Sequence, residues 1–72
     1  MTFDQAKQAR KPFGKFAGQT LDDIAATDEG LRHLDWLVGW FDQKLLLYPN
    51  FQAALRAYLA DPAIAADLER VL

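Results

Sequence analysis

The chain has 72 residues, a formal net charge of −2 at pH 7, and neither cysteine nor serine. A chain of this length forms one domain, and the missing residue types exclude disulfides, thiolate metal sites and hydrolases with a serine or cysteine nucleophile. The apolar runs are far shorter than the roughly 20 residues that span a bilayer, and no signal pattern follows Met1. We therefore expect a cytoplasmic protein with no membrane contact, whose core depends on its aromatic residues.

The N-terminal third of the chain carries the most distinctive pattern. Residues 1–10 are mostly polar, so they are expected to form a flexible arm, or a short helix with few anchors, ahead of a single domain at residues 11–72. Gly14 and Gly18 lie four residues apart among phenylalanines and lysines. This spacing predicts a two-stranded β-hairpin with a tight structural turn and a positive φ at Gly18.

Helix signals follow the predicted hairpin. Thr20 starts a capping box before a short helix, and Asp28 is the expected N-cap of a second helix that ends near Phe41. Pro49 and Pro62 suit the first turns of two further helices. The predicted fold class is therefore α+β, with an N-terminal two-stranded β-hairpin packed on a small bundle of three to four helices.

Several segments of the chain, in this order of elements, match a known small domain. They are Pro12-Phe13-Gly14-Lys15-Phe16, Gly18, Leu21-Asp22-Asp23-Ile24, Leu34-Asp35-Trp36-Leu37, Trp40-Phe41-Asp42, Ala53-Ala54-Leu55 and Tyr58-Leu59. Over about residues 11–60 the chain thus resembles the C-terminal domain of exonuclease-X-like 3′–5′ exonucleases, which also occurs as a stand-alone protein. The resemblance implies an accessory or binding domain without the catalytic half, so we expect no enzymatic activity.

The basic end of the chain is the candidate nucleic-acid site. Lys11 and Lys15 occupy alternate positions of the predicted strand and should share one face with Arg10 close by. In this interpretation the three cations contact phosphates and Phe16 stacks on a base, which gives weak binding of single-stranded nucleic acid, or association with a nucleic-acid-processing protein. The alternative is that the lysines only solubilise a sheet edge.

Two tryptophans lie one helical turn apart, at positions 36 and 40. In so small a domain we favour core positions for both, because the fold needs their area. A stacking platform for bases is the alternative. Exposure of these rings beside the lysines would favour the nucleic-acid function.

The alternative function is protein–protein interaction, or a small regulatory module that is homodimeric, through an apolar surface from Trp40 to Tyr48. Part of this segment is similar to the glutamine-and-leucine peptide that bacterial replication proteins insert into the sliding clamp. The candidate residues are Gln43, Leu45, Leu46 and Leu47.

A third hypothesis is a fragment of a metal-dependent nuclease built on the acidic residues between Asp22 and Glu29. Their positions at helix starts already account for them, because carboxylates there satisfy free amides and the helix dipole. His33 is the only histidine, and we interpret it as a structural or surface histidine rather than a catalytic base, because neither a nucleophile nor an orienting group accompanies it. We therefore expect neither a metal site nor a cofactor.

Overall fold

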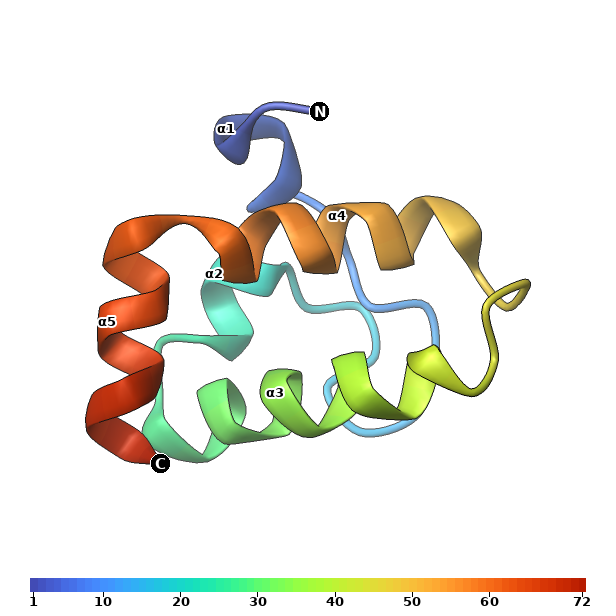
Figure 1. Cartoon of the computed structure of the whole chain (residues 1–72). Helices are drawn as coiled ribbons and strands as arrows, with labels where there is room; N and C mark the ends of the chain where they lie inside the picture. The colour runs from blue at the N-terminus through green and yellow to red at the C-terminus, as the bar shows by residue number, and fades with distance from the viewer.

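The computed structural model describes all residues, 1–72, as five α-helices (Figure 1). The long helices α3 (Asp28–Asp42) and α4 (Pro49–Ala60) lie side by side and run in opposite directions, joined by a loop. The helix α5 (Pro62–Val71) packs across one end of this pair, while the short helices α1 (Phe3–Ala6) and α2 (Leu21–Ile24) pack on α4 and α3. No helix is long or apolar enough to cross a membrane.

Side-chain caps fix where the longer helices begin. α3 is capped by Thr27 rather than by the predicted Asp28, because the Thr27 hydroxyl accepts from the Gly30 amide at 3.0 Å. α4 begins at Pro49, as predicted, and the carboxylate of Asp61 accepts from the first amides of α5. The signals for these two helices are confirmed.

The core lies between α3 and α4 and is closed by the two short helices. Its largest fully buried side chains include Phe41 and Tyr58, and α1 contributes Ala6, which is also fully buried. The Phe3 ring stacks on Tyr58 at 5.4 Å between ring centroids. The expected arm, residues 1–10, thus contains a helix that reaches the core.

The Tyr58 hydroxyl connects this core to α2. It donates a 3.0 Å hydrogen bond to the carboxylate of Asp22, and burial together with this bond raises the pKa of Tyr58 far above its ordinary value. The phenol is therefore protonated at every physiological pH. Its hydrogen bond gives a structural role to Asp22, one of the acidic residues considered as metal ligands.

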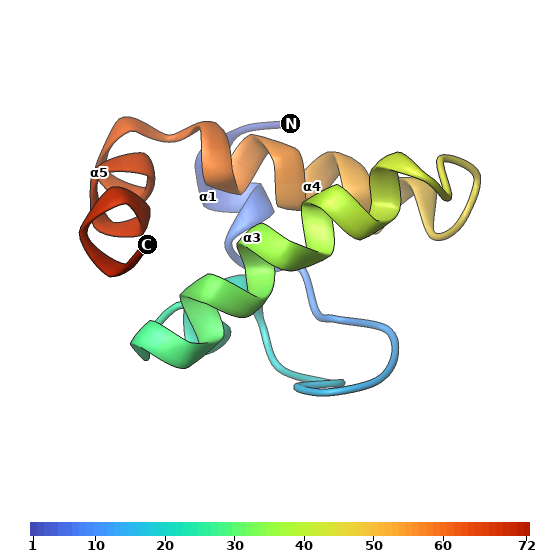
Figure 2. The same cartoon turned by 60° about the horizontal axis from the view of Figure 1, so that its bottom comes forward.

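The predicted β-hairpin and the α+β class are wrong, because the chain forms only helices and one isolated antiparallel bridge between Arg10 and Thr20. Backbone bonds on either side of this bridge close a loop that we call the bridged loop, residues 11–19, which runs out from the helices (Figure 2). Pairing cannot extend beyond the bridge because α2 begins directly after Thr20.

Three left-handed residues explain why the bridged loop does not form strands. Gly14, Phe16 and Gly18 have φ values of +66°, +67° and +84°, so the chain turns repeatedly where a strand would stay extended. The positive φ predicted for Gly18 is confirmed. Pro12 also has no N–H with which to continue a ladder.

Candidate functional site

The Lys11 ammonium lies inside the bridged loop. Lys11 is only 2% exposed, and its Nζ donates a 2.6 Å hydrogen bond to the Phe13 carbonyl oxygen and lies 4.2 Å from the centroid of the Phe13 ring. Burial lowers the pKa of this amine from its ordinary value. The cation therefore organises the loop, and it does not lie at a surface where it could meet phosphate.

The other predicted cations also have partners within the chain. The Arg10 guanidinium donates to the Gly18 carbonyl oxygen at 2.7 Å, and Lys15 forms a 2.8 Å ion pair with Glu29. Lys15 remains exposed, whereas Lys11 points into the loop, so the expected common face of the two lysines does not form. That expectation was wrong because it assumed strand alternation.

Four rings form a continuous row on the outer face of α3 and the bridged loop, which we call the ring row. Phe16 and His33 are 5.3 Å apart between ring centroids, His33 and Trp36 are 5.6 Å apart, and Trp36 and Trp40 are stacked at 6.2 Å. Residues 33, 36 and 40 share one helical face by their spacing of three and four. This spacing was the sequence signal for the row.

Trp36 is the open part of the ring row. It is 58% exposed, so the interpretation of this residue as core is wrong, while Trp40 and Phe16 are half-buried. The core of α3 is formed instead by smaller side chains and Phe41. An aromatic ring at the surface of so small a protein therefore needs an explanation other than packing.

A lysine stands at each end of the ring row. The Lys15 Nζ lies 5.2 Å from the Phe16 ring centroid, and the Lys44 Nζ lies 5.3 Å from the Trp40 ring centroid. Sequence reasoning missed Lys44, because it follows α3 in a loop whose path the sequence does not specify. The exposed aromatic ring thus lies between two surface cations.

His33 contributes its ring to the row in the neutral state. Burial and, next, the ammonium of Lys11 lower its pKa from the ordinary value, and Lys15 acts in the same direction. Its Nε2 atom is shielded from solvent and has no hydrogen-bond partner. The imidazole therefore acts here as a packed aromatic ring, in agreement with its interpretation as a structural histidine.

The acidic residues between positions 22 and 29 point to separate partners. Besides Asp22 with Tyr58 and Glu29 with Lys15, Asp28 lies 3.8 Å from Arg70. The ion pair with Lys15 lowers the pKa of Glu29. No three histidine, aspartate or glutamate side chains come close enough together to hold a metal ion.

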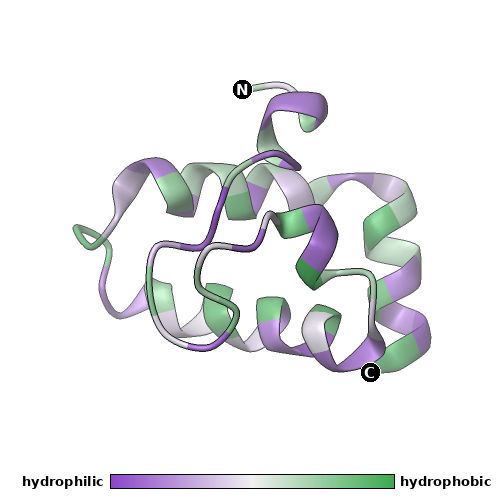
Figure 3. Cartoon of the chain, turned by 180° about the vertical axis from the view of Figure 1, so that it is seen from behind, coloured by the Kyte–Doolittle hydropathy of each residue, from purple (hydrophilic) through white to green (hydrophobic).

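The loop between α3 and α4 exposes the leucines that sequence analysis selected, and we call residues 43–47 the leucine loop. Leu46 is 94% exposed and Leu45 65% exposed, and the hydropathy colouring shows this loop as an apolar tip (Figure 3). The loop is nevertheless fixed, because Gln52 is buried and its Nε2 donates to the carbonyl oxygens of Lys44 and Leu47 at 2.9 and 2.6 Å. Gln43 is exposed at the start of the loop.

Comparison of the chain with models of protein families, with curated protein sequences and with solved structures gave no match.

Proposed function

We propose that the protein is a non-catalytic accessory module that binds single-stranded nucleic acid weakly through the ring row. The observation that carries the proposal is the exposed Trp36 ring, stacked in a row of four rings with a lysine at each end. Unpaired bases stack on exposed aromatic rings, and ammonium groups contact the phosphates on either side. The ring row offers both kinds of contact on one surface.

The contacting residues differ from those expected from the sequence. Lys15 and Phe16 stay in the proposed site, while Trp36, Trp40 and Lys44 join it. Arg10 and Lys11 instead stabilise the bridged loop: Arg10 donates a hydrogen bond to the Gly18 carbonyl oxygen, and Lys11 donates one to the Phe13 carbonyl oxygen. Binding through two lysines predicts a log–log salt slope of about −1.4 for a single strand, at roughly −0.7 per phosphate contact.

The strength of binding should be modest. The chain carries a net charge of −2, and Glu29 competes with phosphate for Lys15. Contacts between the lysines and the phosphates are nevertheless strongest at low ionic strength, where they are least screened and release the most counterions. A labelled strand titrated at low salt is therefore the appropriate assay.

The test is fluorescence anisotropy of labelled oligo(dT) and oligo(rU) with the wild-type protein and three variants. Trp36→Ala should lose most of the binding, since stacking contributes roughly 1–3 kcal/mol per base, while Trp36→Phe should retain part of it. Lys44→Ala should flatten the salt slope by about 0.7. Arg70→Ala, which removes an exposed cation that pairs with Asp28 and contacts no ring of the row, is the matched control and should change nothing.

Two outcomes would refute the proposal. One is the absence of binding to either oligonucleotide at low salt. The other is equal binding by wild-type protein and Trp36→Ala, which would mean that any affinity is a charge effect without stacking. A duplex of the same sequence should bind more weakly than the single strand, because its bases are already stacked.

A further inference from the structure

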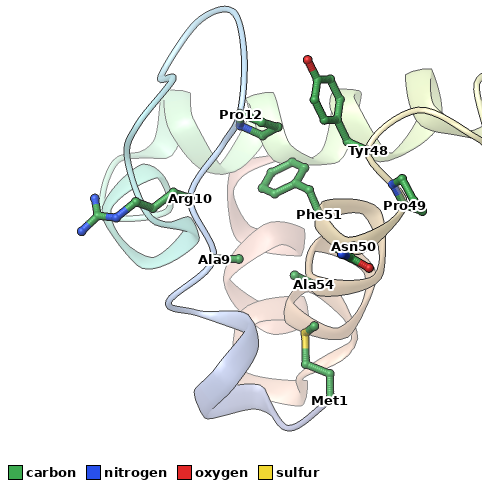
Figure 4. A pocket seen from close by; sticks show the side chains of 9 residues that line it. All are labelled: Met1, Ala9, Arg10, Pro12, Tyr48, Pro49, Asn50, Phe51 and Ala54. Atoms are coloured by element: carbon green, nitrogen blue, oxygen red, sulfur yellow. The ribbon is translucent and has the colours of Figure 1, made fainter.

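An apolar groove of about 510 Å³ lies beside the leucine loop (Figure 4). Its walls come from the N-terminal segment and from the start of α4. The main apolar lining residues are Met1, Ala9, Pro12, Tyr48, Phe51 and Ala54. Arg10 contributes only its aliphatic stem, because its guanidinium points away from the groove and donates to the Gly18 carbonyl oxygen.

The tip of the leucine loop matches the chemistry of this groove. Leu45 and Leu46 project without contact to the core, and Lys44 directs its ammonium back over the Trp40 ring. The projecting surface is therefore apolar and uncharged, like the groove. Gln52 holds the loop backbone from within the protein, so little conformational freedom remains to be lost when the loop is buried.

The loop and the groove are adjacent in the chain and in space. Leu47 ends the leucine loop, and Tyr48 and Pro49, which follow directly, line the groove. A two-fold symmetric interface places the same patch of two copies face to face, so the patch has to be complementary to itself. A patch with a projecting apolar loop next to an apolar groove meets this requirement.

We infer that the protein forms a two-fold symmetric dimer in which the leucine loop of each copy inserts into the apolar groove of the other. This inference does not rest on the proposed nucleic-acid function: no groove-lining residue belongs to the ring row, and although Lys44 lies in the leucine loop, its ammonium turns back over the Trp40 ring while Leu45 and Leu46 are the side chains that insert. It gives Leu46, the most exposed leucine of the chain, a partner of matching chemistry, namely a second copy. The contact is small, so the dimer is a weak one that forms at high protein concentration.

The test is sedimentation velocity of the full chain from roughly 5 µM to 1 mM, a range suited to a small interface. The wild-type mass should rise above the monomer value of 8.1 kDa with concentration. Leu46→Asp should weaken dimerisation roughly 100-fold or more, because each dimer buries this leucine twice and each burial is worth at least about tenfold. Leu72→Asp, at an exposed leucine outside the groove, is the matched control and should dimerise normally.

A pair of complementary variants identifies the contact. Leu46→Asp places a negative charge on the loop, and Pro12→Lys places a positive charge on the exposed rim of the groove. Each variant alone should be monomeric. The mixture should associate, since one contact is then wild type and the other joins opposite charges.

The inference is overturned if the wild-type protein stays monomeric at 1 mM, which would leave the leucine loop to a different protein. It is equally overturned if the wild type dimerises but Leu46→Asp dimerises as well, or if the mixture of the two variants stays monomeric. Circular dichroism of each variant confirms that it is folded, which is expected because Leu46 and Pro12 are both exposed.

Discussion

Replacing Gln52 by methionine tests whether one buried side chain fixes the leucine loop. Gln52 is 5% exposed and spans the loop by donating from Nε2 to the carbonyl oxygens of Lys44 and Leu47. Methionine has a similar length and no amide, so it removes both of these hydrogen bonds, together with a long 3.5 Å bond that Arg56 donates to Gln52 Oε1, and leaves the packing volume in place. The Lys44 oxygen still accepts from the Leu47 amide, whereas the Leu47 oxygen loses its only donor within the protein.

The expected loss follows from these two bonds. At about 0.5–1.5 kcal/mol for each net hydrogen bond, the free energy of unfolding should fall by roughly 1–3 kcal/mol. For a domain of this size each kcal/mol shifts the melting temperature by about 4–8 °C. Thermal denaturation followed by circular dichroism should therefore show a drop of roughly 5–20 °C, a large fraction of the stability of so small a protein.

The control is Gln43→Met, at an exposed glutamine of the same loop whose side chain makes no hydrogen bond. It should leave the melting temperature within about 2–3 °C of wild type, as surface substitutions do. An unchanged melting temperature for Gln52→Met would refute the reasoning, because the loop would then be held by other contacts.

Three further substitutions and one titration probe the same structure. Gly18→Val should lower the free energy of unfolding by at least about 1 kcal/mol. The loss comes from backbone strain at a φ of +84° and not from a clash, because a Cβ at this position meets nothing within 4 Å. An unchanged urea midpoint would contradict that conformation. Gly39→Ala should stabilise the protein by roughly 0.5–1 kcal/mol, because a Cβ enters open space on a helix. Gly30→Ala should lose about 1–3 kcal/mol or more, because its Cβ would lie 1.8 Å from the Ile24 carbonyl oxygen, and equal urea midpoints for the two alanine variants would refute both assignments. The pKa of His33 is lowered in the folded state, so the contribution of the neutral imidazole to the free energy of unfolding is fully present above the unfolded value of about 6.5 and is lost as the pH falls below it. Urea midpoints measured from pH 7.5 to 5.5 should therefore decline for wild type and stay flatter for His33→Gln.

The helices of the C-terminal two thirds were predictable from local chemistry. Proline at the first turn of α4 and the Asp61 cap of α5 act within a few residues, so the sequence carries their signal directly. The cap of α3 was predicted one residue too late because Thr27 and Asp28 both have suitable side chains. The first residue of a helix depends on which of two neighbouring side-chain oxygens accepts the hydrogen bond from a free amide of the first turn, and in α3 this is the Thr27 hydroxyl.

The bridged loop was not predictable from local chemistry. Two glycines and an alternation of lysines and aromatic residues favour a hairpin, but the left-handed conformation of Phe16 has no local signal. The burial of Lys11 depends on the loop closing around its ammonium, and a buried lysine is rare enough to be a poor prediction from sequence. The candidate phosphate contacts were wrong in part for this reason.

The exposure of Trp36 also depends on tertiary structure. Its helical spacing with Trp40 is equally consistent with a core and with a surface row, and smaller side chains on the opposite face of α3 fill the core instead. The sequence therefore located the aromatic pair but assigned Trp36 to the wrong side of the helix.

The most direct test of the central claim is an NMR titration of the ¹⁵N-labelled protein with oligo(dT) at low ionic strength. The account predicts that the indole N–H signals of Trp36 and Trp40 shift most, together with backbone amides of the bridged loop near Lys15 and Phe16, while signals of α5 stay in place. Shifts confined to the leucine loop and the groove, or no shifts at all, would contradict single-strand binding on the ring row.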